Sequence, residues 1–213
     1  MPPAKPLYVQ FGCGPCAPES WLNFDASPTL RIERLPVVGR FFRRNAVRFP
    51  PNVRIGNIVR GLPVPPESCA GLYGSHVLEH LALDEFRTAL ANCHRLLRPG
   101  GILRVVMPDL EYIVERYVGR KDREPAIAAA EFMRESVLGE ESRPRRPMQR
   151  LADAIGNSRH RWLWDYAALA DEMQRAGFVR IRRCHCYDCD DLRFKEVEDP
   201  ARFEGALAVE CRR

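Results

Sequence analysis

The sequence lacks any long apolar run. No stretch approaches the ~20 consecutive apolar residues of a membrane-spanning helix. The N-terminal MPPAKP has no apolar segment of the kind that a signal peptide carries. We therefore expect a cytoplasmic protein with no membrane partner.

A disulfide scaffold is also disfavoured. Eight cysteines are scattered at irregular spacings through 213 residues, which is typical of reduced thiols rather than of a small secreted fold. With 46% hydrophobic residues, the chain can bury one sizeable core. We predict a single domain over residues 1–213, with residues 139–157 forming a mobile insertion.

The formal charge of +5 is modest but unevenly distributed. Residues 31–60 contain one acid, Glu33, and eight arginines: Arg31, Arg34, Arg40, Arg43, Arg44, Arg48, Arg54 and Arg60. A second cluster consists of Arg143, Arg145, Arg146 and Arg150. Such clusters suit a phosphorylated or acidic-sugar substrate or a nucleic acid, but solvated loops have the same composition. No aromatic-rich nucleic-acid motif accompanies them, so nucleic acid remains an alternative that we do not favour.

The most informative stretch is LYVQFGCGPCAPESWLNFD, residues 7–25. A short apolar run ends in Gly12-Cys13-Gly14, and a second run ends in Asp25. Glycine lets the chain turn sharply and approach a ligand closely, because it has no Cβ. An acid at the tip of the neighbouring strand can accept hydrogen bonds from ribose hydroxyls. The pattern therefore predicts a nucleoside-type cofactor.

Three further blocks follow in order. LPVP at residues 62–65 precedes AGLYGSHVLEHL at 70–81, HRLLRPGG at 94–101 leads into the apolar run 102–107, and Pro108-Asp109 comes next. In this order the chain resembles the class I S-adenosylmethionine-dependent methyltransferases, and within them a group of small bacterial type 11-like methyltransferases often found near sugar and polysaccharide genes. The resemblance is clear over residues 7–110 and looser from His160 to Phe178.

The resemblance implies a Rossmann-like α/β fold with a mostly parallel seven-stranded sheet and an antiparallel strand at its edge. Residues 14–21 are too few for the usual first helix, so we expect that helix to be reduced or absent. Apolar spacing predicts a helix over 84–97, in which Phe86, Leu90 and Cys93 share one face. Residues 27–51 are expected to cover the cofactor or to form a plain loop.

The implied cofactor is S-adenosylmethionine. Its predicted contacts lie at the ends of the first four strands: Phe11, Gly12, Cys13, Gly14, Asp25, Asn57, Ser75 and His76. Asp25 is implied as the ribose ligand. Asn57 stands where many relatives have an aspartate near the adenine. The expected reaction is methyl transfer to an oxygen or nitrogen of a small molecule or saccharide.

A hydroxyl acceptor needs a base, whereas an amine needs less help. The predicted candidates are His76, then Asp109 and His160. His76, Glu79 and His80 also form H-x-x-E-H, a zinc-peptidase pattern, although we expect His80 to be structural. A non-catalytic module that binds S-adenosylmethionine is a further alternative. Cys184, Cys186 and Cys189 have metal-ligand spacing. However, Cys184 ends a predicted strand, in which alternate side chains point to opposite faces, so these cysteines do not easily converge on one ion.

Overall fold

The computed structural model describes residues 6–36, 48–139 and 159–213. Apart from Gly139, the predicted insertion lies outside these ranges, as do the second arginine cluster and Arg40, Arg43 and Arg44. Within the described ranges, no helix is long and apolar enough to cross a membrane.

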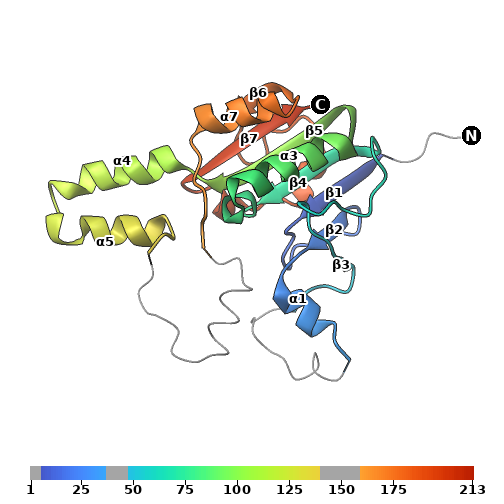
Figure 1. Cartoon of the computed structure of the whole chain (residues 1–213), viewed down its shortest axis with the longest axis horizontal. Coiled ribbons are helices and arrows are strands. Elements are labelled where there is room, and N and C mark those ends of the chain that lie inside the picture. The colour runs from blue at the N-terminus through green and yellow to red at the C-terminus, as the bar shows by residue number, and fades with distance from the viewer. Residues whose placement is uncertain (1–5, 37–47, 140–158) are drawn as a thin grey trace, which may run out of the picture.

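The core of the fold is one seven-stranded sheet in the order β3-β2-β1-β4-β5-β7-β6 (Figure 1). Neighbouring strands from β3 to β5 are parallel, and β7 runs antiparallel between β5 and β6. The predicted fold class is therefore confirmed. The carboxyl ends of β1 to β5 meet at one edge, where open α/β sheets bind ligands. The strands are β1 Leu7–Phe11, β2 Leu22–Asp25, β3 Val53–Ile55, β4 Cys69–Ser75, β5 Leu97–Pro108, β6 Val179–Arg183 and β7 Ala206–Arg212.

Helix α3 lies along one face of the sheet, and α7 packs beside β6, while α4 and α5 form an antiparallel pair that projects from the sheet (Figure 1). A short helix, α1, follows β2, and three short 3₁₀ turns complete the set. Their bounds are α1 Pro28–Glu33, η1 Leu78–His80, α3 Leu83–Leu96, α4 Leu110–Lys121, α5 Pro125–Glu135, α7 Tyr166–Arg175, η2 Leu192–Glu196 and η3 Pro200–Arg202.

Helix α3 shows why this sequence packs as it does. Phe86, Leu90 and Cys93 are spaced three to four residues apart and are fully buried against the sheet. The Glu85 carboxylate accepts the backbone N–H of Ala82 at 3.0 Å, which satisfies a donor at the first turn. Truncating Leu90 to alanine would cost about 2–5 kcal/mol of stability.

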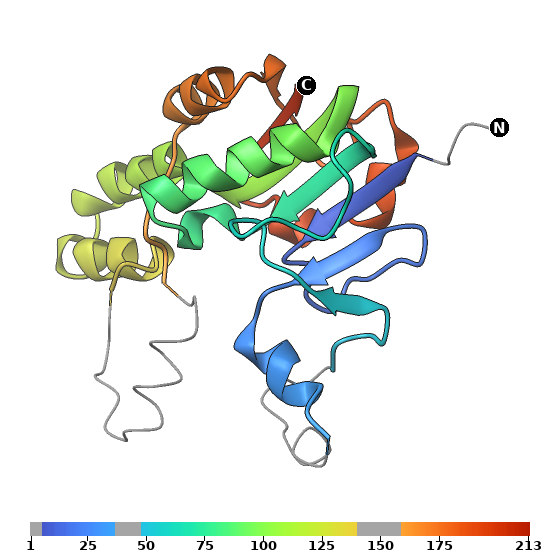
Figure 2. The same cartoon turned by 45° about the vertical axis from the view of Figure 1, so that its right-hand side comes forward.

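The opposite face is covered in an unusual way. Residues 12–21, which join β1 to β2, form no helix, as expected. Instead the β6–β7 connection, residues 184–205, carries η2 and η3 across this face; Figure 2 shows it in orange and red behind β1 and β4. Phe194 at its centre is fully buried, with edge-on contacts to the rings of Tyr8, Trp21 and Tyr73. The chain's last connection thus takes the place of its first helix.

Candidate functional site

The loop after β1 turns at two glycines in the left-handed region. Gly12 has φ +66° and Gly14 has φ +55°, where other residues are strained. A Cβ on Gly12 would lie 2.2 Å from Cγ2 of Val77, just beyond β4. A Cβ on Gly14 would meet no described atom within 4 Å. The loop therefore packs closely against the β4 end and leaves space beside Gly14.

Asp25 lies at the end of β2 and holds this loop. Its Oδ2 accepts the backbone N–H of Gly14 at 3.0 Å, and its Oδ1 accepts that of Ser27 at 2.8 Å. Each carboxylate oxygen retains a second lone pair that can accept a hydroxyl. The structure thus brings Gly14 and Asp25 together, and the ribose contact of Asp25 remains a prediction.

Phe11 and Cys13 have structural roles in this loop. The Phe11 ring lies against Gly74 in the core, where a Cβ on the glycine would be 2.3 Å away. The backbone N–H of Cys13 donates to the Phe24 carbonyl at 3.1 Å. Burial raises the pKa of the Cys13 thiol to about 12, so the thiol stays protonated. Their contact with the cofactor remains a prediction.

Asn57 lies two residues beyond β3. Its Oδ1 accepts the backbone N–H groups of Val59 at 2.8 Å and Arg60 at 3.3 Å, forming a local turn. This turn fixes the side chain. The adenine contact therefore depends on the Nδ2 donor, and it stays a prediction.

A small cavity of about 110 Å³ lies between the ends of β1 and β4 and the β6–β7 connection. Two buried hydroxyls in its vicinity, Tyr73 Oη and Ser75 Oγ, have no hydrogen-bond partner among the described residues. Burial raises the Tyr73 pKa, so this hydroxyl keeps its proton to donate. Buried polar groups without partners are costly. A polar group of a bound ligand would satisfy them.

These residues fit S-adenosylmethionine. The cavity is smaller than the ~300–1,000 Å³ of usual ligand pockets, so it suits one polar end of the cofactor rather than the whole. The open space beside Gly14 lies next to this cavity, at the end of β1. The Asp25 carboxylate follows at the end of the neighbouring strand, β2.

Arg202 lines the cavity but lies in no motif of the sequence. It comes from η3, and its Nη1 donates to the Ser75 carbonyl at 3.2 Å. Its own carbonyl oxygen lies 3.0 Å from Nε2 of His76. No local motif marks Arg202, because 127 residues separate it from Ser75. It supplies a cation at the cavity wall.

His76 follows β4 with φ +53°, and protein groups face both of its ring nitrogens. Nε2 donates to the Arg202 carbonyl, and Nδ1 lies 3.4 Å from Oε1 of Glu79. Burial lowers the His76 pKa, but the Glu79 carboxylate and the Arg202 carbonyl outweigh it, and the net pKa is raised. To act as a base, His76 would have to release one of these contacts.

His160 approaches the same carboxylate from residues 159–164, the segment before α7. Its ring centroid lies 5.1 Å from that of His80, and its Nδ1 lies 2.9 Å from the Ser136 carbonyl. Burial lowers the His160 pKa. The structure therefore brings His76 and His160, two of the three predicted catalytic residues, around Glu79.

Asp109 makes its contacts with other residues than these histidines do. It caps α4 by accepting the Glu111 N–H at 3.0 Å, and its Oδ2 lies 3.3 Å from Nη1 of Arg183. Capping and the ion pair account for this buried carboxylate. Its catalytic role remains a prediction.

The two metal-like patterns differ in the structure. Across the described ranges, one group of three possible metal ligands converges, namely Glu79, His80 and His160. The three cysteines at 184, 186 and 189 do not form such a group. A zinc peptidase of this pattern needs both histidines on one helix. Here the motif contains only the short 3₁₀ turn η1, Leu78–His80, and His76 lies before it.

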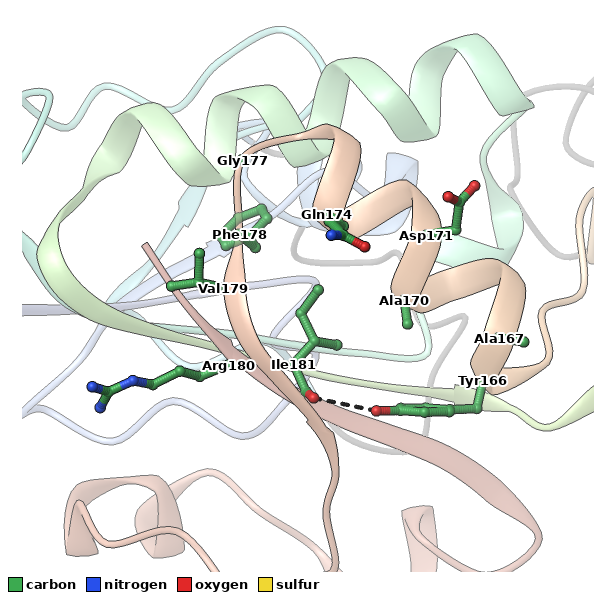
Figure 3. Close-up of a pocket in the computed structure, with 10 residues that line it drawn as sticks. All are labelled: Tyr166, Ala167, Ala170, Asp171, Gln174, Gly177, Phe178, Val179, Arg180 and Ile181. Carbon is green, nitrogen blue, oxygen red and sulfur yellow. Dashed lines mark hydrogen bonds between the residues drawn. The ribbon is translucent and has the colours of Figure 1, made fainter.

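A larger groove of about 690 Å³ runs between α7 and β6 (Figure 3). Tyr166 closes one end, where its hydroxyl donates to the Ile181 carbonyl at 3.2 Å. Among the described residues, Asp171 and Arg180 are its only charged lining residues, and none of the predicted site residues lies in it.

Comparisons with known proteins bear on the family and on the fold. Residues 9–105 match the family model of a methyltransferase domain. An S-adenosylmethionine-dependent methyltransferase from Archaeoglobus fulgidus is similar in structure, with a TM-score of 0.52 and 13% identity, covering 98% of this chain and 86% of that one. One from Thermotoga maritima has a TM-score of 0.51 and 16% identity, covering 97% and 81%.

No curated protein matches the sequence. At these identities the solved structures support the fold, while the family model supports the activity. The matched residues 9–105 contain the glycine loop, Asp25 and Asn57. They also contain His76, Glu79 and His80, but not His160. Residues 9–105 thus match a methyltransferase domain, and the chain shares the fold of S-adenosylmethionine-dependent methyltransferases.

Proposed function

We propose that the chain methylates a hydroxyl or amine of a small-molecule or saccharide acceptor at the carboxyl end of β4. The observation that carries this proposal is that the cavity beside the glycine loop is connected to a group of histidines around Glu79. A cavity with buried hydroxyls lies beside the glycine loop, and His76 joins its wall to the Glu79 cluster through the Arg202 carbonyl.

The cofactor contacts follow from the polar groups at the strand ends. Asp25 accepts the ribose hydroxyls, and the Asn57 amide faces the adenine. Arg202 and the hydroxyls of Tyr73 and Ser75 meet the amino-carboxylate end, where a guanidinium forms charge-assisted hydrogen bonds. When bound, S-adenosylmethionine supplies a methyl group made electrophilic by its sulfonium.

The acceptor side must align a nucleophile and remove its proton if it is a hydroxyl. His160 suits this role, because its Nδ1–H donates to Ser136 and leaves the Nε2 lone pair available. His76 needs to break a contact first, and Asp109 is held by Arg183. His160 is therefore our first choice of base.

Trp162 supports a saccharide acceptor. Its backbone N–H donates to the Glu79 carbonyl at 3.2 Å, and the residue is 42% exposed beside the cluster. An exposed indole offers an apolar face with a polar edge, on which the C–H face of a sugar ring can pack.

The cofactor contacts can be tested by calorimetric titration with S-adenosylmethionine and S-adenosylhomocysteine. We expect binding by the wild type and a loss of at least ~10-fold in affinity in Asp25→Ala, because that change removes the ribose acceptor. Asp84→Ala, an exposed acid on α3, should bind as the wild type does. Equal affinities in both variants would contradict the ribose contact.

Turnover separates the enzyme from its rival, a non-catalytic binding module. Transfer of labelled methyl groups to hydroxyl and amino sugars, measured with and without His160→Gln, addresses the acceptor. Cofactor binding without transfer to any acceptor class would favour the module.

A further inference from the structure

Glu79 is the least satisfied acid near the acceptor side. It is 1% exposed, and neither carboxylate oxygen has a hydrogen-bond partner among the described residues. The nearest histidine nitrogens lie beyond ordinary hydrogen-bond distance from it, with His76 Nδ1 at 3.4 Å and His80 Nε2 at 3.9 Å. A buried carboxylate left in this condition is costly. Such a group requires an explanation, and a bound cation is one.

Two histidines beside Glu79, His80 and His160, are held in the tautomer that a metal requires. His80 Nδ1 lies 2.9 Å from the Arg159 carbonyl, and His160 Nδ1 lies 2.9 Å from the Ser136 carbonyl. A carbonyl oxygen can only accept, so each Nδ1 carries the proton. Each neutral ring then has its lone pair on Nε2. Metal-binding histidines are oriented in this way by a backbone carbonyl behind the ring.

We propose that Glu79, His80 and His160 bind a divalent transition-metal ion of the Zn²⁺ class. One ring nitrogen of each histidine and one Glu79 oxygen all lie within 4.8 Å of one another. Two imidazoles with one carboxylate suit Zn²⁺ and Co²⁺, and three protein ligands leave a fourth position for a water or a substrate oxygen.

The ligand atoms must move closer together by roughly 1 Å. Ligand bonds to Zn²⁺ are ~2.0–2.2 Å, so the ligand atoms of a tetrahedral site lie ~3.3–3.6 Å apart, against separations within 4.8 Å here. The backbone supports the required closure, because the Glu79 carbonyl accepts the N–H of Arg161 at 2.7 Å. This bond fixes the segment that carries His160 against η1.

The position of the ion gives it a use, and this part rests on the proposed function. His76 lies between the Glu79 carboxylate and the Arg202 carbonyl at the cavity wall. An ion on Glu79 would therefore lie on the acceptor side of the cofactor. With the ion bound, His160 is a ligand and no longer the base, and the open position can hold the oxygen of an acceptor hydroxyl and lower the pKa of that hydroxyl.

The test is equilibrium dialysis of chelator-stripped protein against Co²⁺, without cofactor or acceptor, followed by visible spectroscopy. We expect about one Co²⁺ per chain with weak d–d absorption and no thiolate charge-transfer band, as a nitrogen and oxygen ligand set predicts. Glu79→Gln and His160→Ala should each lower the affinity at least ~10-fold. His185→Ala, an exposed histidine in the β6–β7 connection, is the matched control.

Urea unfolding of the stripped proteins separates a metal site from a packing role. Without its metal ion, the buried Glu79 carboxylate does not stabilise the fold through its charge. Metal-free Glu79→Gln should therefore unfold at the same or a higher urea concentration than the metal-free wild type. Lower stability with unchanged Co²⁺ uptake would overturn the proposal. Uptake that His160→Ala leaves intact, or that a thiolate band accompanies, would also overturn it. Because no cofactor is present, failure here leaves methyl transfer untouched.

Discussion

Arg104 on β5 and Glu198 in the β6–β7 connection form an ion pair with Nη2 and Oε1 2.6 Å apart, and their side chains are 1% and 0% exposed. The same guanidinium bonds Glu210 at 2.7 Å and Asp188 at 3.0 Å. Burial raises the Asp188 pKa, but hydrogen bonds from Arg182, the His185 backbone and Arg104 bring it down to about 2. Arg104 thus fixes the connection to the sheet.

Replacing Arg104 with methionine should destabilise the protein by about 3–5 kcal/mol, because it leaves buried carboxylates without their cation. The free energy of unfolding from urea titrations measures the effect. Arg54→Met, at an exposed position on β3, should change that free energy by less than ~0.5 kcal/mol. Similar values for the two variants would show that Arg104 does not anchor the connection.

Gly12→Ala should abolish cofactor binding, because the new Cβ would meet Val77 and displace the loop. Gly100→Ala is the control for backbone strain. It has φ +75° and no described atom within 4 Å of its Cβ, and it lies in β5 away from the cavity. Calorimetric titration with S-adenosylhomocysteine should detect binding in Gly100→Ala alone. Retained affinity in Gly12→Ala would contradict the close approach of the loop to Val77.

Arg202→Gln should weaken S-adenosylhomocysteine binding about 10–100-fold, the loss expected for a charge-assisted contact to a carboxylate. 5′-Methylthioadenosine lacks that amino-carboxylate, so its affinity should be the same in both proteins. Arg193→Gln, in the same connection but over the Tyr8 ring, should bind both ligands normally. A parallel loss for both ligands would indicate a disturbed fold instead of a lost carboxylate contact.

His94 on α3 should make stability fall in mild acid. Burial, and secondarily Arg213, lower its pKa in the folded state. The folded protein therefore favours neutral His94, and this contribution is present above the unfolded pKa of ~6.5 and is lost as the pH falls through the folded value. Urea titrations between pH 7.5 and 5 should show a smaller loss in His94→Gln. An identical pH dependence would exclude His94 as a contributor.

Local patterns predicted much of the fold. The helix expected over 84–97 is Leu83–Leu96, because its apolar spacing matches a helix face. The apolar run 102–107 lies in a strand, as its composition indicates, but that strand begins earlier, at Leu97. Pro99-Gly100-Gly101 is typical of a turn, but Gly100 and Gly101 bond the backbone of Arg213. That pairing with the chain's last residue is invisible in a local window.

The site shows the same limit. Gly12, Gly14 and Asp25 were predictable, because a strand followed by glycines and a strand ending in an acid are adjacent in sequence. Arg202 was not, since only the β6–β7 connection brings it to Ser75. The H-x-x-E-H motif contains Glu79 and His80, although His80 was expected to be structural, and His160, which lies beside them, comes from a segment 80 residues later. Its placement depends on tertiary packing.

Covering the glycine-loop face with the β6–β7 connection also affects how the protein is made. The cavity wall joins Gly12, near the beginning of the chain, to Arg202, near its end. Contacts so distant in sequence carry a large loop-closure cost and form late. During synthesis the glycine loop emerges well before residues 184–205, so its cavity has no wall until that connection leaves the ribosome. Cofactor binding should therefore report folding that has joined the glycine loop to the β6–β7 connection.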